Sequence, residues 1–407
     1  MDISGNSSIM FHATWRNLPL NNAMTKREDS QVSSIPCDWD DAARLRRFRA
    51  AVARWYGRHA RDLPWRQDPT TYSIWISEIM LQQTQVETVK PYFQRFLARF
   101  PDVASLAKAQ EEQVLRLWEG LGYYRRARQL HAAARVIVDE LDGQFPEQAD
   151  AVLALPGIGR YTMGAILSIA LDQRLPILEA NTIRLFSRLV GFEGDASSRD
   201  GQAKLWGLAE QVLPKKNIGR FNQGLMEIGS LVCHVRDPNC GQCPVRGECW
   251  SFANGRQESI PPTKRKNYEQ VNEVAMVVRR RDRVLLRQHT DEERWSGLWD
   301  FPRIQLPRRF GQENRRSRMA KRLAAAIAAE TGIQVSSPRW VTRIKYGVTR
   351  YRITLDCFEA EAARGRLKRT NAPLKWVELD KLEEFPTNTT GRKIARMCQR
   401  SSVQEGN

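Results

Sequence analysis

Four of the seven cysteines in this chain lie within 17 residues, at a spacing suited to binding a metal. Cys233, Cys240, Cys243 and Cys249 are arranged as C-x6-C-x2-C-x5-C, and the other three cysteines are scattered. A disulfide framework is disfavoured, because such frameworks are typical of short secreted domains and this chain has 407 residues. Four thiolates suit either a zinc ion or a [4Fe-4S] cluster, and their chemistry alone leaves both possibilities open.

Two glutamates in separate segments could together cleave a glycosidic bond. Glu78 lies among the apolar residues of 74–81, where burial would raise its pKa and make it a general acid near neutral pH. Glu179 follows an apolar run and precedes a helical pattern at 180–190. One acid that protonates a leaving group and one carboxylate that stabilises an oxocarbenium-like centre are the pair that glycoside hydrolysis uses. The alternatives are an exposed helix glutamate at 78 and an N-cap or first-turn acid at 179.

A glycine-containing loop between two helices could bind a phosphate. Residues 149–154 favour a short helix, and an apolar helical run follows Gly157 and Gly159. Glycines let the backbone approach a ligand closely, and the N-terminus of a helix attracts anions. An ordinary helix–helix turn explains this stretch equally well.

The charge of the chain favours a nucleic-acid partner. Lysine and arginine number 64 against 46 acidic residues, which gives a formal net charge of +18. A balance this basic is typical of proteins that bind polyanions, although an inert basic surface is the alternative. We expect no membrane span and no signal peptide, because no long apolar run and no cleavage pattern are present. The five histidines show no arrangement typical of a metal site or a catalytic triad.

Hydrophobic periodicity divides the chain into four regions. We expect a disordered tail at 1–40, a mostly α-helical domain at 41–255, a polar linker at 256–270 and an α+β domain at 271–398. The helices expected in the first domain are at 41–59, 72–81, 86–99, 111–121, 124–142, 149–154, 180–190, 199–213 and 220–233, with an interruption at 63–66. In the second domain the patterns predict strands at 271–278, 283–287 and 350–358 and a helix at 320–330.

The order of strands, an aromatic loop at 295–302 and a helix in the last region resembles a Nudix fold. A Nudix hydrolase needs acidic residues on that helix, but the chain has Ala325, Ala326 and Ala329 there and keeps only Glu330. We therefore expect a domain that binds its ligand and does not cleave it.

Several separated motifs together resemble the A/G-specific adenine DNA glycosylases of the MutY type, in the helix-hairpin-helix iron–sulfur superfamily. The motifs are residues 76–86, 120–128 and 155–160 and the four cysteines, whose spacing is that of endonuclease III-type glycosylases. The resemblance implies a mostly α-helical helix-hairpin-helix glycosylase domain with a [4Fe-4S] loop, followed by an α+β Nudix-like C-terminal domain. It also implies a monomeric enzyme, cytoplasmic with the bacterial nucleoid, that removes adenine opposite 8-oxoguanine or guanine in double-stranded DNA.

The resemblance also implies a role for each matching residue. Glu78 protonates adenine, and Glu179 and Asn181 lie beside the sugar cation. Tyr161 stands where glycosylase–lyases carry a lysine, so no Schiff base forms there and the enzyme is monofunctional. Trp65 and Arg66 would line the adenine pocket, and Gln83 and Tyr123 would enter the duplex. Gly157 and Gly159 would bind a backbone phosphate, and Cys233, Cys240, Cys243 and Cys249 would hold the cluster.

The chain departs from the family pattern at two places. Glu179 replaces an aspartate, which moves the carboxylate outward by about 1 Å in a site where small displacements matter. The Phe-Ser-His loop that contacts 8-oxoguanine becomes Val348-Thr349-Arg350, where Thr349 could donate a hydrogen bond and Arg350 could bind a phosphate or a guanine edge. A glycosylase for another base, such as thymine opposite guanine, and a catalytically impaired DNA-binding module are the alternative functions.

Overall fold

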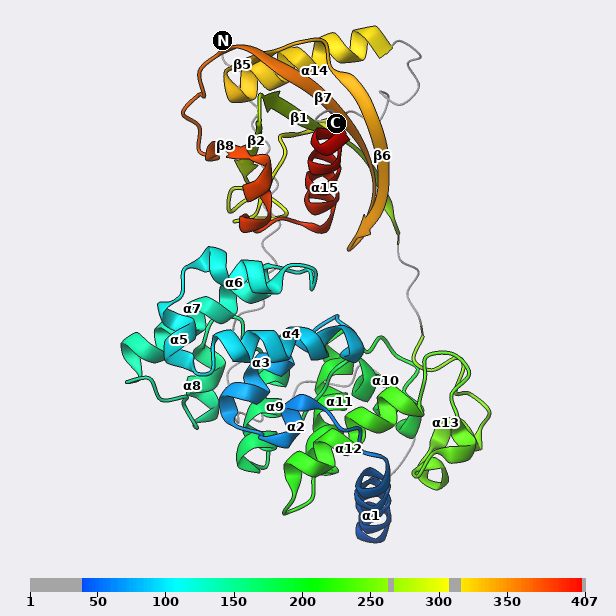
Figure 1. The fold of residues 1–407 in the computed structure, drawn as a ribbon. Helices are drawn as coiled ribbons and strands as arrows, with labels where there is room; N and C mark the ends of the chain where they lie inside the picture. Colours follow the sequence, from blue (N-terminus) through cyan, green and yellow to red (C-terminus); the bar gives the residue numbers. More distant parts are fainter. Residues whose placement is uncertain (1–38, 263–266, 307–315, 405–407) are drawn as a thin grey trace, which may run out of the picture. The chain divides into compact units, whose positions relative to one another are not determined.

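The computed structural model describes residues 39–262, 267–306 and 316–404, which form a helical region and a region built on a β-sheet (Figure 1). The helices of the first region are α1 (Ala42–His59), α2 (Pro64–Gln67), α3 (Thr71–Leu81), α4 (Val86–Arg99), α5 (Val103–Lys108), α6 (Glu111–Trp118), α7 (Arg125–Glu140), α8 (Ala149–Ala154), α9 (Arg160–Leu171), α10 (Ala180–Val190), α11 (Arg199–Gln211), α12 (Ile218–Leu231) and α13 (Trp250–Ala253). Two short 3-10 helices, Cys240–Gln242 and Arg246–Glu248, lie between α12 and α13.

The predicted helices of this region are confirmed, with shifts of up to three residues at their ends. The expectation that 63–66 only interrupts the helical pattern was wrong, because Pro64 begins the single turn of α2. Proline is favoured at the first helical position, where its missing N–H is not needed. Helix α5 was not predicted, and Asp102 and Ser105 begin it with a reciprocal capping box.

Helix α3 lies in the middle of the helical core. Every residue from Ser73 to Met80 is buried, and the largest buried side chains of this core include Trp75 of α3 itself, Trp118 and Phe96. A helix that is apolar on all sides must be surrounded by other elements. Thr70 caps its N-terminus by accepting a hydrogen bond from the backbone N–H of Ser73 at 3.1 Å. The placement of α3 therefore carries Glu78 into the interior.

The second region is an α+β fold. Its elements are β1 (Glu269–Arg280), β2 (Arg283–Gln288), β3 (Trp299–Asp300), β4 (Arg303–Leu306), α14 (Arg316–Thr331), β5 (Ile333–Val335), β6 (Arg339–Val348), β7 (Tyr351–Gly365), β8 (Leu374–Glu378), a 3-10 helix (Leu379–Glu384) and α15 (Thr389–Gln404). The long strands β1 and β7 are parallel, and the other pairings are antiparallel. The predicted strands are confirmed as parts of β1, β2 and β7, whereas β6 and α15 were not predicted.

Strand β1 separates the two hydrophobic cores of this region by alternation. Val274 and Met276 pack with Leu323 of α14, whereas Ala275 and Val277 belong to the core that contains α15. The two helices therefore cover opposite faces of the sheet (Figure 1).

Two sequence expectations fall partly outside the described residues. Of the predicted tail at 1–40, residues 1–38 are not described, and Trp39 is buried against Phe48 with ring centroids 5.0 Å apart. The expectation of disorder was therefore wrong at Trp39. Residues 263–266 of the predicted linker are likewise not described. Among the described helices, none is long and apolar enough to cross a membrane.

Candidate active site

A cavity of about 410 Å³ is lined by residues of α2, α3, α9, α10 and α12 and of the loop after α3. This volume is typical of sites for small organic ligands. Six residues singled out in the sequence line it, namely Trp65, Arg66, Glu78, Tyr161, Glu179 and Asn181. The fold thus gathers side chains from segments more than 100 residues apart into one site.

Glu78 is a buried carboxyl in this cavity. Its side chain is 3% exposed in the last turns of α3, among apolar neighbours. Burial raises the pKa of Glu78 to about 7, the nearby charge of Glu179 adds to this increase, and a hydrogen bond from Tyr161 opposes it. A carboxyl with this pKa is partly protonated at neutral pH and can donate a proton to a bound ligand.

Tyr161 reaches Glu78 from the first turn of α9. Its hydroxyl donates a hydrogen bond to Oε2 of Glu78 at 2.6 Å. Burial and the two glutamate charges raise the pKa of Tyr161 well above its ordinary value, so the phenol stays protonated as a donor. No lysine lines the cavity in the described part of the chain, so the site offers no amine nucleophile for a Schiff base.

Glu179 is the N-cap of α10 and also lines the cavity. Its carboxylate accepts hydrogen bonds from the backbone N–H groups of Asn181, at 2.8 Å, and Thr182, at 3.0 Å. The hydroxyl of Thr182 in turn accepts from the backbone N–H of Glu179 at 2.8 Å. Burial raises the pKa of Glu179, and the two backbone donors oppose that increase by stabilising the ionised form. The two interpretations of Glu179, a helix cap and a site carboxylate, are therefore compatible.

Asn181 is fixed on both sides of its amide group. Its Nδ2 donates to Oε2 of Glu179 at 3.3 Å, and its Oδ1 accepts from Nη2 of Arg184 at 2.9 Å. Gly229 of α12 approaches so closely that a Cβ atom there would lie 2.7 Å from the Cβ of Asn181. The absence of a side chain at 229 therefore lets α12 pack against the start of α10.

Glu227 is a site residue that the sequence analysis missed. It is 1% exposed on α12, and it lines the cavity together with Arg61 and Arg66. Nε of Arg61 donates to it at 2.9 Å and Nη2 of Arg66 at 2.7 Å. The available signal was a single acidic residue with apolar neighbours, Met226 and Ile228, which is similar to the signal at Glu78. Trp65 is buried beside this group, with its ring edge-on to Phe93 at 5.5 Å.

Two residues assigned to the duplex lie outside the cavity, each at the tip of a loop. Gln83 is exposed with φ 57°, and Tyr123 is 42% exposed with φ 50°. Residues other than glycine rarely adopt this left-handed backbone conformation, so the backbone is strained at both positions.

The predicted hairpin lies between α8 and α9 and also stays outside the cavity. Gly157 has φ 79°, and a Cβ atom there would meet Cβ of Gln129 at 2.7 Å, so both its conformation and its packing require glycine. Gly159 is the N-cap of α9, with open space around its Cα. The start of this 12-residue helix therefore offers accessible N–H groups to an anion.

Thr349 and Arg350 form the two-residue turn between β6 and β7. Both are exposed, Thr349 has φ 50°, and the guanidinium of Arg350 donates to the hydroxyl of Tyr351 at 3.0 Å. Glu330, the one acidic residue left in the Nudix-type helix, pairs with Arg287 at 2.8 Å. That pairing is consistent with the expectation that this domain does not cleave its ligand.

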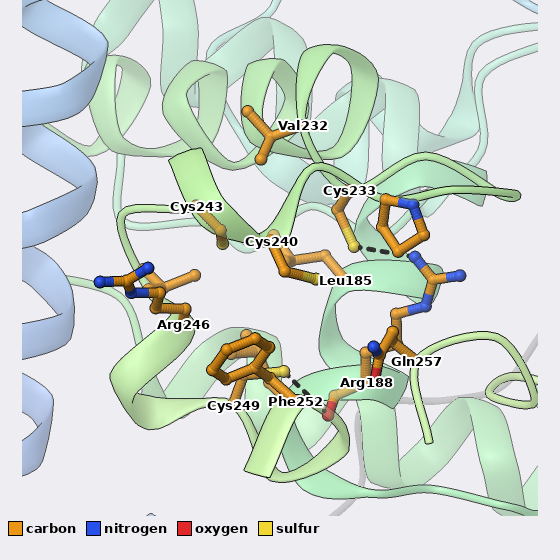
Figure 2. A pocket seen from close by; sticks show the side chains of 13 residues that line it. Leu185, Arg188, Val232, Cys233, Cys240, Cys243, Arg246, Cys249, Phe252 and Gln257 are labelled. Atoms are coloured by element: carbon orange, nitrogen blue, oxygen red, sulfur yellow. Dashed lines mark hydrogen bonds between the residues drawn. The ribbon is translucent and has the colours of Figure 1, made fainter. Parts of the chain in front are cut away.

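The four clustered cysteines line a second cavity (Figure 2). Burial raises the pKa of Cys243 to about 12 and that of Cys249 to about 11, so a compensating positive charge is needed for these thiols to become thiolates. Arg188 supplies one cation, since its Nη1 donates to Sγ of Cys233 at 3.3 Å. Among the described residues, no three histidine, cysteine or acidic side chains lie close enough together to hold a single metal ion.

Two family models match this chain. Residues 76–211 match the HhH-GPD superfamily of base excision DNA repair proteins, and residues 274–397 match the NUDIX domain. The adenine DNA glycosylase of Buchnera aphidicola subsp. Schizaphis graminum is 38% identical over 257 residues, which span 63% of this chain and 74% of that protein. The human adenine DNA glycosylase is 42% identical over 229 residues, which span 54% of this chain and 42% of that protein. A solved thermostable thymine-DNA glycosylase aligns with a TM-score of 0.49 and 28% identity, over 52% of this chain and 98% of its own.

Proposed function

Because the chain belongs to the adenine DNA glycosylase family, we propose that it removes adenine opposite 8-oxoguanine or guanine in double-stranded DNA. The observation that carries the proposal is the buried Glu78, with a pKa of about 7, in a cavity of about 410 Å³. Adenine is a poor leaving group until it is protonated, and a buried, neutral carboxylic acid can supply that proton.

The proposed reaction is hydrolysis of the N-glycosidic bond. Glu78 gives its proton to a ring nitrogen of adenine, and the bond from that base to C1′ breaks with its electron pair going to the base. The sugar is left cationic, and the carboxylate of Glu179 stabilises it together with Asn181. Water then attacks C1′ and loses a proton. Tyr161 holds one oxygen of Glu78 and cannot form a Schiff base, so the enzyme is monofunctional.

The polar side of the cavity fits the edge of an adenine. Glu227 can accept a hydrogen bond from the exocyclic amino group, whereas the guanidinium groups of Arg61 and Arg66 can donate to ring nitrogens. Trp65 supplies an apolar surface for the base. Thymine presents a carbonyl oxygen at the position of that amino group, so this arrangement favours adenine.

The proposed DNA contacts come from loops outside the cavity. Gln83 and Tyr123 enter the duplex from their loop tips and take the place of the extruded adenine. Gly157 and Gly159 bring the start of α9 to a backbone phosphate. On the sheet region, Thr349 donates to the base opposite adenine and Arg350 binds it or its phosphate. The enzyme acts as a monomer on this duplex.

A [4Fe-4S] cluster is the proposed occupant of the cysteine cavity, held by Cys233, Cys240, Cys243 and Cys249. The C-x6-C-x2-C-x5-C spacing of these four cysteines, which is that of endonuclease III-type glycosylases, supports the cluster over a single zinc ion. Its role is structural, because four thiolates leave no open coordination position. The loop that it would order carries Arg236 and Arg246, which can contact backbone phosphates.

Single-turnover excision on matched duplexes tests the function. We expect release of adenine from A:8-oxoguanine and A:G duplexes and no release from A:T or T:G duplexes, with strands cleaved only after alkali. Thymine release from T:G without adenine release would replace the proposal by a glycosylase for another base. Tight binding to every duplex without release of any base would replace it by a DNA-binding module.

A further inference from the structure

Arg126 is a buried guanidinium that contacts two loops at once. It lies in the first turn of α7 and is 9% exposed. Its Nη1 donates to the backbone carbonyls of Ile79, Met80 and Gln82 at 2.7, 2.9 and 2.5 Å. Its Nη2 donates to Oγ1 of Thr84 at 3.2 Å and to the carbonyl of Gly122 at 3.1 Å.

These acceptors flank the two strained loop tips. Gln82 and Thr84 are the neighbours of Gln83, and Gly122 precedes Tyr123. The guanidinium carbon also lies 5.5 Å from the centroid of the Tyr123 ring, within the range of a cation–π contact. One side chain therefore holds the backbone carbonyl just before Gln83, the Thr84 hydroxyl just after it and the backbone carbonyl just before Tyr123.

The same guanidinium caps the C-terminus of α3. The last carbonyls of a helix have no partner within it, and a cation is favoured at that end. Ile79 and Met80 directly follow Glu78, so the group that fixes the two tips also fixes the turn that carries the buried acid.

We propose that Arg126 is a positioning residue that holds Gln83 and Tyr123 in their duplex-entering conformations and ties them to the helix that carries Glu78. This inference rests on the proposed function, because it assumes that both tips enter DNA. Arginine suits this role because its planar fork reaches acceptors in several directions, whereas the ammonium of lysine is a compact point charge on a flexible stem.

The test compares Arg126→Lys with the parent in a Glu78→Gln background, so that no base is excised during binding. A 2-aminopurine placed beside the mispaired adenine fluoresces more strongly when the stack opens. We expect the Glu78→Gln protein with Arg126 intact to raise the fluorescence and the Arg126→Lys double variant to lose most of that increase. The duplex affinities of these two proteins should agree within about threefold. With Glu78 restored, single-turnover excision by Arg126→Lys should fall about 10²-fold, the cost typical of a misplacement of about 1 Å.

Arg49→Lys is the matched control. Arg49 also caps a helix, since it donates to the carbonyls of Gln211 and Val212 at 2.9 Å each, and neither of these acceptors lies in either loop. It should keep both the fluorescence increase and the excision rate. If Arg126→Lys shows the parental fluorescence increase, or if Arg49→Lys loses as much of it, the inference is wrong. A parent that opens the stack but excises no adenine would instead refute the proposed function and leave the role of Arg126 standing.

Discussion

The hydroxyl of Tyr161 donates a hydrogen bond to Oε2 of Glu78 at 2.6 Å. This contact joins the first turn of α9, just after the glycine hairpin, to the central helix α3. Burial favours the neutral acid and the tyrosine donor favours the carboxylate, and the balance places the pKa of Glu78 at about 7. The tyrosine therefore lowers the pH range in which the acid is protonated, against the larger effect of burial.

Tyr161→Phe should extend excision to higher pH. The acid is active when protonated, so the rate falls as pH rises through the pKa of Glu78. Removing the phenol removes a donor that stabilises the carboxylate, which raises that pKa further. In single-turnover rates measured between pH 5.5 and 9, the fall in rate should occur at a higher pH than in the parent. If the fall in rate occurs at the same pH as in the parent or at a lower pH, Tyr161 does not lower the pKa of Glu78.

Glu78→Gln should abolish excision and leave duplex binding largely intact. The amide has the same shape but no acidic proton, and general acid catalysis contributes about 10²- to 10⁴-fold. Rates on an A:8-oxoguanine duplex and equilibrium binding to the same duplex separate the two effects. Glu140→Gln, at an exposed glutamate at the end of α7, should match the parent in both measurements. Excision by Glu78→Gln at a rate near that of the parent would remove Glu78 from its role.

The same substitution should stabilise the protein at alkaline pH. The pKa of Glu78 is about 7 in the fold against a model value of 4.5, so the folded state holds its proton more tightly. The folding stability that Glu78 contributes is therefore fully present below pH 4.5 and is lost as pH rises through 7. Glutamine does not titrate, so the variant should gain on the order of 3 kcal/mol relative to the parent between pH 4.5 and pH 8. Urea unfolding of the parent and the variant at both pH values measures this difference. If their free energies of unfolding differ by the same amount at both pH values, the expectation is wrong.

The sequence predicted those parts of the fold that follow from local patterns. Helices such as α4 and α10 have apolar periodicity and defined ends, and their predicted bounds match the structure. The one-turn helix α2 is too short to show such a pattern. Strand β6 does alternate, since Ile344, Tyr346 and Val348 lie on one face, but the sequence analysis did not predict it.

The candidate site was predicted in its members but not in its geometry. Glu78 and Glu227 are each the single acid of their helix, and one sequence does not show which face of each helix meets the cavity. The apolar run at 74–81 indicated Glu78, whereas the helix of Glu227 also carries Arg220, Asn222 and Gln223. The meeting of Glu78, Tyr161 and Glu179 depends on the packing of α3, α9 and α10, which is tertiary structure.

Replacement of Cys243 should weaken DNA binding more than chemistry on bound DNA. The purified protein should be yellow-brown, with broad absorbance in the blue from a [4Fe-4S] cluster. Cys243→Ser should lose this absorbance and lower duplex affinity, because the loop between the cysteines loses its anchor. Single-turnover excision at saturating protein should change less than affinity does. Cys398→Ser, at a buried thiol outside the cysteine cavity, is the control. A colourless, fully active protein that contains zinc would refute the cluster.

Glu179 should be the working second carboxylate, although it also caps α10. Its backbone hydrogen bonds fix the carboxylate at the cavity wall, and its negative charge is what a developing sugar cation needs. Glu179→Asp keeps the charge and is a favourable N-cap, so it should retain substantial excision. Glu179→Gln keeps the length but loses the charge, so it should lose most of the excision rate and little affinity, because the charge acts when the sugar becomes cationic.

Loss of the helix cap must be separated from loss of the charge. Ser198 caps α11 by accepting from the backbone N–H of Gly201 at 3.0 Å, and it does not line the cavity. Ser198→Ala should cost about 1 kcal/mol of stability and leave excision unchanged, which gives the effect of a lost cap alone. Glu179→Gln should then lose far more excision than its stability explains. If it excises adenine as fast as the parent, another group stabilises the cation. If the parent is inactive and Glu179→Asp restores excision, the longer side chain has disabled the site and the protein acts on DNA by binding alone.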